Sequence, residues 1–291
     1  FDKVEITPAA AGPDDTRDVL VMVEEARTTN FVVGVGISSD AGLLGNVTIE
    51  NRNFDLFGWP KQFGQLFTGR AFKGAGQTLR VVAEPGTEIN RFQVQFYEPY
   101  FLDKELSLGS NLFFFTRPRE AYDETRVGYV LSFGQRFRKF WSLEESVRVE
   151  MVDISNVDND APSDITDVEG SNFIIGGKVA IARDTTDNRF LPTEGSRLSL
   201  SVEPVGGTST FARLYGSYHA YHTVRTDVYD RKSVLSGRVD IGYIAGDAPV
   251  FERFYAGGIS TIRGFKFRGV GPVAGPDDDP VGGNFLFLAG T

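Results

Sequence analysis

Apolar residues recur at every second position over segment after segment from residue 31 onward, and this periodicity most strongly limits what the chain can fold into. It is clear in residues 31–37, 91–97 and 235–243, and in residues 143–151 with Glu145 as an exception. Successive side chains of a β-strand point to opposite faces of its sheet, so each segment is predicted to be a strand with one apolar face. The content of 33 glycines and 25 phenylalanines in 291 residues also favours an all-β chain.

Strand length and the character of the second face separate two all-β architectures. In a soluble sandwich, strands of about 5–6 residues share an apolar core and expose a polar face. Here many strands extend to about 9 residues or more, the length that crosses a bilayer at a tilt, and their polar faces carry both charge signs together with glycine. A transmembrane antiparallel β-barrel with a wet interior explains both features. The periodicity favours that barrel and leaves a sandwich or a soluble barrel open.

About twelve barrel strands are predicted, joined by short and long connections. Short connections are expected at residues 84–87 and 135–140, and long ones at residues 153–171 and 245–283. Alternation of short turns with long loops is typical of outer-membrane barrels. The predicted strands lie near residues 31–40, 43–54, 76–85, 90–98, 105–116, 126–137, 142–154, 171–183, 196–204, 211–223, 233–245 and 283–290.

Two segments depart from this rhythm. Residues 1–30 hold two short strand candidates, residues 3–7 and 18–24, which cannot be stable alone and are expected to complete a small α/β domain lying mostly upstream. The chain opens on a strand-like segment without a signal peptide, which indicates a processed start or an excerpt. Residues 58–76, which include Trp59, are too long for a tight turn and are predicted to be an amphipathic excursion at a membrane interface.

Nothing in the sequence indicates catalysis, a cofactor or a metal. His219 and His222, the only histidines, point to opposite faces of one strand and cannot share a metal ion. The acidic segments 158–167 and 277–279 lack the ordered ligand spacing of a calcium loop, so they are interpreted as solvated loops. The net charge of −9 argues against nucleic acid as a partner.

Two motifs and an opening strand pair resemble one known family. The first motif is Phe-Tyr-Ala-Gly-Gly-Ile-Ser-Thr-Ile-Arg-Gly-Phe at residues 254–265. The second joins Asp-Thr-Thr-Asp-Asn-Arg at residues 184–189 to Pro-Thr-Glu-Gly-Ser-Arg at residues 192–197. Together with the glycine-rich segment 34–45, they resemble the BamA family of outer-membrane protein assembly factors, in the family's own order along residues 31–291.

The resemblance implies a domain organisation. Residues 1–30 would be the C-terminal part of the last POTRA domain, an α/β unit, and residues 31–291 would be an outer-membrane β-barrel. Barrels of the family have about sixteen strands, within the range of bacterial barrels. Because only about twelve are predicted here, the barrel is expected to be incomplete at its C-terminus, since an open edge in lipid would leave backbone amides unpaired.

The resemblance also implies three groups of site residues. The loop carrying the first motif would fold back into the lumen, where Arg263 needs an anionic partner, expected to be a carboxylate on a later strand. The first strand, loosely packed at its glycines, would part from the last strand and offer an edge to an incoming strand. The groups are Ile262, Arg263, Gly264 and Phe265 in the lumen loop; Phe31, Val33, Gly34, Val35, Gly36 and Ile37 in the lateral-gate strand; and Asp184, Asp187, Asn188, Arg189, Pro192 and Gly195 in a structural turn.

The implied function is the insertion and folding of β-barrel proteins into the bacterial outer membrane through a lateral seam, without nucleotide and without enzymatic chemistry. The expected partners are unfolded outer-membrane protein clients, outer-membrane lipid and accessory subunits of an assembly machinery, with no nucleic acid and no cofactor. A polypeptide secretion pore of the same superfamily, of two-partner or autotransporter type, is the alternative, and a passive diffusion porin is a third possibility.

Overall fold

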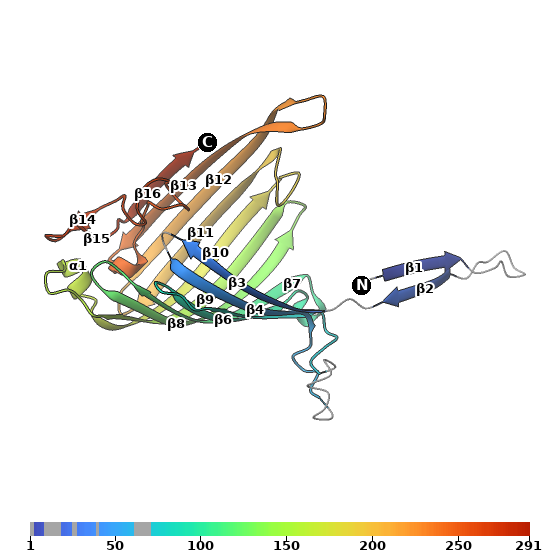
Figure 1. Cartoon of the computed structure of the whole chain (residues 1–291), viewed down its shortest axis with the longest axis horizontal. Coiled ribbons are helices and arrows are strands. Elements are labelled where there is room, and N and C mark those ends of the chain that lie inside the picture. The colour runs from blue at the N-terminus through green and yellow to red at the C-terminus, as the bar shows by residue number, and fades with distance from the viewer. Residues whose placement is uncertain (1–2, 9–18, 25–27, 39–40, 61–70) are drawn as a thin grey trace, which may run out of the picture.

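The computed structural model describes residues 3–8, 19–24, 28–38, 41–60 and 71–291. Its main body is one antiparallel sheet of twelve strands, which curls around a lumen and confirms the predicted barrel architecture (Figure 1). Every strand pairs with its neighbours in sequence, as expected for an up-and-down barrel. The strands are β3 (Thr29–Ser38), β4 (Gly42–Phe54), β5 (Gln77–Glu84), β6 (Asn90–Glu98), β7 (Leu106–Pro118), β8 (Asp123–Phe137), β9 (Trp141–Ser155), β10 (Gly170–Asp184), β11 (Gly195–Gly207), β12 (Phe211–Thr226), β13 (Lys232–Gly246) and β16 (Phe285–Gly290).

The smaller elements lie outside this sheet. Strands β1 (Lys3–Pro8) and β2 (Val19–Glu24) lie close to the two strands predicted at residues 3–7 and 18–24, and they pair as a separate hairpin. Strands β14 (Val273–Ala274) and β15 (Asp279–Pro280) pair within the long loop before β16, and helix α1 (Ser163–Thr166) lies in the loop before β10. No helix among the described residues is long and apolar enough to cross a membrane.

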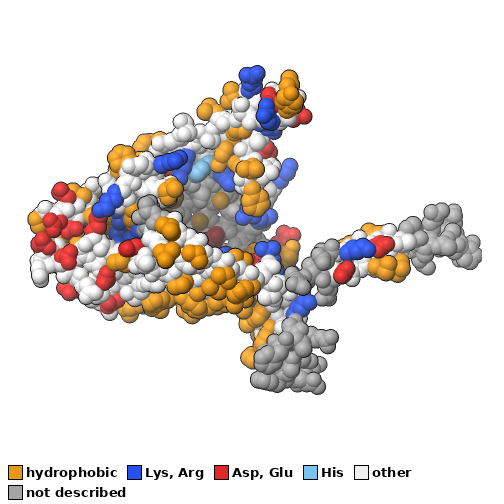
Figure 2. Space-filling view, viewed as in Figure 1, with side chains coloured by type: hydrophobic (Ala, Val, Ile, Leu, Met, Phe, Trp, Pro, Cys, Tyr) orange, Lys and Arg blue, Asp and Glu red, His pale blue; other side chains and the backbone are white. Residues whose placement is uncertain are grey.

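The register of the sheet sorts side chains between an outer wall and the lumen. Leu112, Tyr129, Val149 and Ile175 stand opposite one another on four successive strands and form part of an apolar outer face. Apolar side chains cover the outer wall in Figure 2, and the interior is visibly hollowed. Arg148, one residue before Val149, faces the lumen instead. The two-residue periodicity therefore separates a lipid-facing wall from a polar interior.

The two ends of the barrel carry different connections. We call the end where β3 begins the N-terminal rim and the opposite end the far rim. The N-terminal rim carries the connections 55–76, 99–105, 138–140, 185–194 and 227–231, and the far rim carries 85–89, 119–122, 156–169, 208–210 and 247–284. The short turn at 85–89 shares the far rim with the longest loops.

Apolar packing inside the barrel is concentrated near the far rim. There the inward-facing side chains of the strands change from charged to apolar, as at Ile154 and Ile174. Ile165 of α1 and Val250 of the loop after β13 complete this buried cluster. The cluster fixes the long loops against the inner wall, because apolar burial at about 25 cal/mol per Å² is the main source of packing energy. The far end of the lumen is thereby partly plugged by the chain's own loops.

Candidate functional site: a loop anchored in the lumen and an open sheet edge

The loop formed by residues 247–284 enters the lumen immediately after β13. It begins with a short 3₁₀ turn, Val250–Glu252, whose residues are buried. Glycine is required within the loop, because a Cβ atom on Gly257, which has a φ of 105°, would lie 2.2 Å from the carbonyl oxygen of Lys266. The loop's return arm is bonded to its outgoing arm by paired amides between Phe254 and Gly283, each 2.9 Å. These contacts give the loop base a single defined path.

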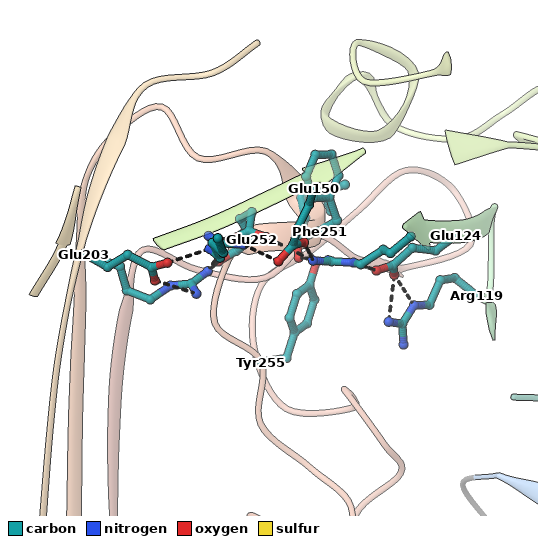
Figure 3. A network of polar contacts seen from close by, with 11 residues as sticks. Arg119, Glu124, Glu150, Glu203, Phe251, Glu252 and Tyr255 are labelled. Carbon is teal, nitrogen blue, oxygen red and sulfur yellow. Dashed lines mark hydrogen bonds and ion pairs between the residues drawn. The ribbon is translucent and has the colours of Figure 1, made fainter. Parts of the chain in front are cut away.

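Glu252 anchors the base of this loop to the barrel wall. Its carboxylate, only 3 % exposed, accepts hydrogen bonds from three arginines on three strands (Figure 3). Arg126 of β8 lies at 3.1 Å, Arg148 of β9 at 2.8 Å and Arg213 of β12 at 2.7 Å. Arg126 also donates to the carbonyl of Phe251 at 2.7 Å. Charge-assisted bonds of this kind are about twice as strong as neutral ones, so the carboxylate joins the loop to distant parts of the wall.

The arginines around Glu252 belong to a larger network, which we call the lumenal charge cluster. Arg148 crosses β10 to pair with Glu203 of β11, and it can do so because Gly176 has no side chain between them. A Cβ atom on Gly176 would lie 2.9 Å from the Glu203 carboxylate and 3.1 Å from Nε of Arg148. The cluster contains equal numbers of opposite charges, namely Arg119, Arg126, Arg148, Arg213, Glu124, Glu150, Glu203 and Glu252.

The electrostatics of Glu252 follow from this arrangement. Burial by itself raises the pKa of a carboxyl group, because it removes water from the charged form. Hydrogen bonds from Arg148 and the charges of Arg148, Arg213 and Arg126 outweigh burial and lower the pKa of Glu252 to about 2. The group is therefore ionised at every physiological pH, and its charge is matched by the surrounding guanidinium groups.

Aromatic packing supports the segment that follows Glu252. The Phe254 ring lies against Gly242 of β13, where a Cβ atom would meet the ring at 2.5 Å, and stacks on Tyr215 with ring centroids 6.4 Å apart. The Tyr255 hydroxyl donates to the carbonyl of Val250 at 2.7 Å. Gly242 thus leaves space on the inner wall for the Phe254 ring, and any larger residue would fill that space.

The tip of the loop holds the predicted lumen motif. Ile262, Gly264 and Phe265 occupy the turn between the two arms, where Gly258 donates to the carbonyl of Phe265 at 3.0 Å. The tip borders a cavity of about 690 Å³ that is also lined by Arg117 and Arg119 from the far ends of the barrel wall. The motif therefore faces an open space lined by charges of both signs, because Glu88, Glu120 and Asp279 also line it.

Arg263 itself is exposed within that cavity. Among the described residues it makes no hydrogen bond or ion pair, so the carboxylate expected for it is not found there. Its neighbours hold the tip instead: Arg268 lies 3.8 Å over the Tyr255 ring and donates to the Tyr122 hydroxyl at 3.3 Å, and Arg117 lies 4.0 Å over Phe267. The anionic partner of Arg263 remains a prediction.

The predicted lateral-gate strand is an edge of the sheet. Within the described part of the chain, strand β3 pairs with β4 alone, and β16 forms the opposite edge. Its outward side chains, which include Phe31 and Val33, are unusually exposed, reaching 78 % for Val35 and 86 % for Ile37. Gly34 and Gly36 lie between them, and a Cβ atom on either glycine would meet nothing within 4 Å. Strand β3 is therefore the first strand of the sheet and is loosely packed at its two glycines.

The predicted structural turn, residues 185–194, is organised by two side chains. Asp187 accepts hydrogen bonds from the Thr193 hydroxyl and from the amides of Thr193 at 2.8 Å and Glu194 at 3.1 Å, and these bonds lower its pKa. Asn188 accepts the amides of Phe190 and Leu191. Asp184 accepts the Thr186 amide and forms an ion pair with Arg197, which also donates a hydrogen bond to the Arg189 carbonyl. Pro192 follows Leu191 in the turn, and Gly195, with a φ of 97°, is the first residue of β11.

Sequence reasoning missed Glu252 and most of the lumenal charge cluster. A partial signal was available, because Glu124 with Arg126 and Arg148 with Glu150 place opposite charges two residues apart, on one strand face. Nothing local connects Arg126 and Arg148 to Glu252, which lies 126 and 104 residues away along the chain. Among the described residues there is no group of three or more side chains suited to hold a metal.

Comparison with known proteins assigns the family. A profile of the Omp85 superfamily domain matches residues 72–291, which is most of the chain. The chain belongs to the Omp85 superfamily. It is similar to the outer membrane protein assembly factor BamA of Nitratidesulfovibrio vulgaris, with 27% identity over 98% of the chain and 34% of that protein. It is also similar to BamA of Neorickettsia risticii, with 26% identity over 93% of the chain and 34% of that protein.

A solved structure agrees on the fold. The crystal structure of BamA from Haemophilus ducreyi lacking POTRA domains 1–3 superposes with a TM-score of 0.77 at 19% identity, over 99% of this chain and 57% of that one. The resemblance to the BamA family seen in the sequence is thus confirmed, and this Omp85 chain is an outer-membrane protein. The curated relatives are named as assembly factors, in agreement with the expectation that the chain is not an enzyme. The chain spans about a third of their length.

Proposed function

We propose that this Omp85 chain is the barrel portion of a factor that folds β-barrel proteins into the outer membrane through a seam beginning at β3. The match to the Omp85 superfamily and the similarity to proteins named outer membrane protein assembly factors support the proposal. The first strand of the sheet, β3, holds Gly34 and Gly36 and is only loosely packed. An exposed strand edge can add a strand from another chain by backbone hydrogen bonding. An incoming client strand would pair with β3, and the client's own burial and closure would supply the free energy without nucleotide.

The anchored loop favours the seam over the lumen as the client's route. Glu252 and the apolar cluster at the far rim hold residues 247–284 inside the barrel. A polypeptide that crossed the lumen, as in a secretion pore, would have to pass this loop. We assign the tip residues Ile262, Arg263, Gly264 and Phe265 a bracing role, in which Arg263 binds a carboxylate outside the described residues.

We further propose that the β1–β2 hairpin belongs to a POTRA-type domain. Its apolar side chains are exposed on both faces, at Val4 and Ile6 in β1 and at Leu20 and Val21 in β2. A two-stranded hairpin is marginal alone, so further elements of the same domain must cover these faces. The partners of the protein in this account are unfolded outer-membrane clients, outer-membrane lipid and accessory subunits of an assembly machinery.

Depletion of the protein in its own cells tests the function. Unrelated outer-membrane barrels should then accumulate unfolded, which heat-modifiable mobility on gels would detect. If only one secreted polypeptide were lost while those barrels assembled normally, the protein would be a secretion pore. If barrel assembly and secretion both continued and only solute uptake fell, it would be a porin.

A further inference from the structure

The connection between β4 and β5 is the longest at the N-terminal rim, and its described arms have a fixed path. The arms are residues 55–60 and 71–76. The Asp55 amide donates to the carbonyl of Phe72 at 2.8 Å, and the Phe72 amide donates to the carbonyl of Gly58 at 2.9 Å. The amide of Gly74 donates to the Asn53 carbonyl at 3.0 Å. Backbone groups paired in this way lower the cost of leaving water.

A line of aromatic rings joins these arms to the outer wall. Phe96 of β6 lies on the outward face, and its ring meets Phe54 at 6.4 Å between centroids. Phe54 stacks on Phe72 at 5.8 Å, and Phe72 meets Trp59 edge to face at 5.4 Å. The lipid-facing surface therefore continues from the wall into the arms without a break. In Figure 1 the arms leave the wall at the N-terminal rim and project away from the barrel.

The arms end in side chains that have no cover among the described residues. Phe57 is 80 % exposed and Trp59 is 74 % exposed. The neighbouring turns at this rim also expose rings, at Tyr100, Phe140 and Tyr229. Aromatic side chains gather at the headgroup level of outer-membrane barrels, where one part of the ring is apolar and another is wet. The arms extend this band of aromatic side chains outward from the barrel wall.

The low charge of the arms favours lipid over protein as the material that covers their exposed rings. The described arms carry one acidic residue, Asp55, and one basic residue, Lys73. The Asp55 carboxylate is occupied by the Phe57 amide at 3.0 Å. A surface with so little charge, continuous with a lipid-facing wall, suits the boundary between headgroups and acyl chains.

We propose that the arms 55–60 and 71–76 form an interfacial anchor, which seats Phe57 and Trp59 in the leaflet at the N-terminal rim. The anchor lies one strand away from the open edge of β3. The proposal rests on the outer-membrane location of the chain and on this surface, and it is independent of the assembly function.

Depth-dependent fluorescence quenching tests the anchor. The full-length protein is refolded in phospholipid vesicles with one environment-sensitive fluorophore, attached at Phe57→Cys, after any other cysteine has been removed. This chain itself contains none. Val149→Cys on the lipid-facing wall and Glu88→Cys in a far-rim turn are the matched controls, and Trp59→Cys is a second position in the arms.

Lipids brominated close to the headgroup should quench the label at Phe57 about twofold more than lipids brominated near the acyl end, because an interfacial helix or loop sits roughly 5–10 Å deep. For the label at Val149, lipids brominated near the acyl end should be the stronger quenchers. The label at Glu88 should be quenched only by aqueous iodide. Labels in the arms that iodide quenches and bromolipid does not would overturn the proposal. Protection that appears only in native membranes, and not in pure lipid, would overturn it in favour of a protein partner.

Discussion

Replacement of Glu252 by glutamine should release the lumenal loop from the barrel wall. The neutral amide keeps the size of the side chain but leaves Arg126, Arg148 and Arg213 with one negative charge too few. Removal of one partner from a buried ion pair typically costs about 3–5 kcal/mol. The pKa leads to a similar figure, because its fall from 4.5 to about 2 corresponds to roughly 3 kcal/mol at 1.36 kcal/mol per unit.

Hydrogen exchange measured by mass spectrometry reports this release. A loss of roughly 3 kcal/mol raises the population of the undocked loop about 100-fold. Peptides covering residues 250–256 should therefore exchange about 100-fold faster in the Glu252→Gln protein, while the strands keep their protection. Glu144→Gln is the matched control, since Glu144 pairs with Lys178 in an exposed bridge at 3.1 Å. Exposed pairs contribute about 0–1 kcal/mol, so this control should exchange like the wild type.

The pH dependence has a defined sign. A carboxyl group with a lowered pKa in the docked state stabilises that state above its undocked pKa, which is 4.5 for a free glutamate side chain. The contribution declines as pH falls toward the docked pKa of about 2. Docking should therefore be constant from pH 8 to pH 5 and weaken below that range. Equal exchange in Glu252→Gln and wild type, or a docking transition near neutral pH, would refute the assignment of Glu252 as the anchor.

Three further substitutions, the first with its own control variant, test the lumenal loop and the turn at residues 185–194. Gly176→Val should separate the ion pair that crosses β10 and accelerate exchange of the loop base less than Glu252→Gln does, whereas Gly177→Val, where a Cβ atom meets nothing within 4 Å, should leave exchange unchanged. Gly242→Val should displace the ring of Phe254, which limited proteolysis of the loop would detect as faster cleavage. Asp187→Ala should accelerate exchange of the Thr193 amide and leave the other rim turns unaltered.

The sequence predicts the barrel because its main signal is local. Alternation in residues 91–97 or 143–151 follows from lipid on one side of a strand and water on the other, so strand positions and faces can be inferred without knowing any contact. The exception at Glu145 is explained by its depth in the membrane. Glu145 lies on the outward face beside Phe133 and Val179, close to the N-terminal rim. A charge at that depth costs less than one at the midplane.

The candidate site could be predicted only in part. The motif around Arg263 and the glycines of β3 are visible in the sequence, because resemblance and composition mark them. The anchor at Glu252 is not, because it depends on three strands that meet only in the folded barrel. The role of Gly176 is similarly hidden, since a glycine that clears a path between two charged side chains looks like any other glycine in a strand.

The exposed surfaces show a second limit. An exposed apolar side chain such as Val35 of β3 or Phe57 of the β4–β5 connection reads as apolar whether its neighbour is lipid, a client strand or another protein. Periodicity identifies the face but not its occupant. The open edge and the interfacial arms therefore needed the fold before their roles could be proposed.

The most direct test of the central claim is a lock on the seam. Gly34 accepts a cysteine without a clash, so Gly34→Cys can be paired with a cysteine on the last strand of the full-length barrel. The control pairs the same Gly34→Cys with Asn46→Cys, its partner in register on β4. Reconstituted protein should lose client insertion when the seam is oxidised, regain it on reduction, and keep it throughout in the control. Undiminished insertion with the seam locked would contradict a lateral route that begins at β3.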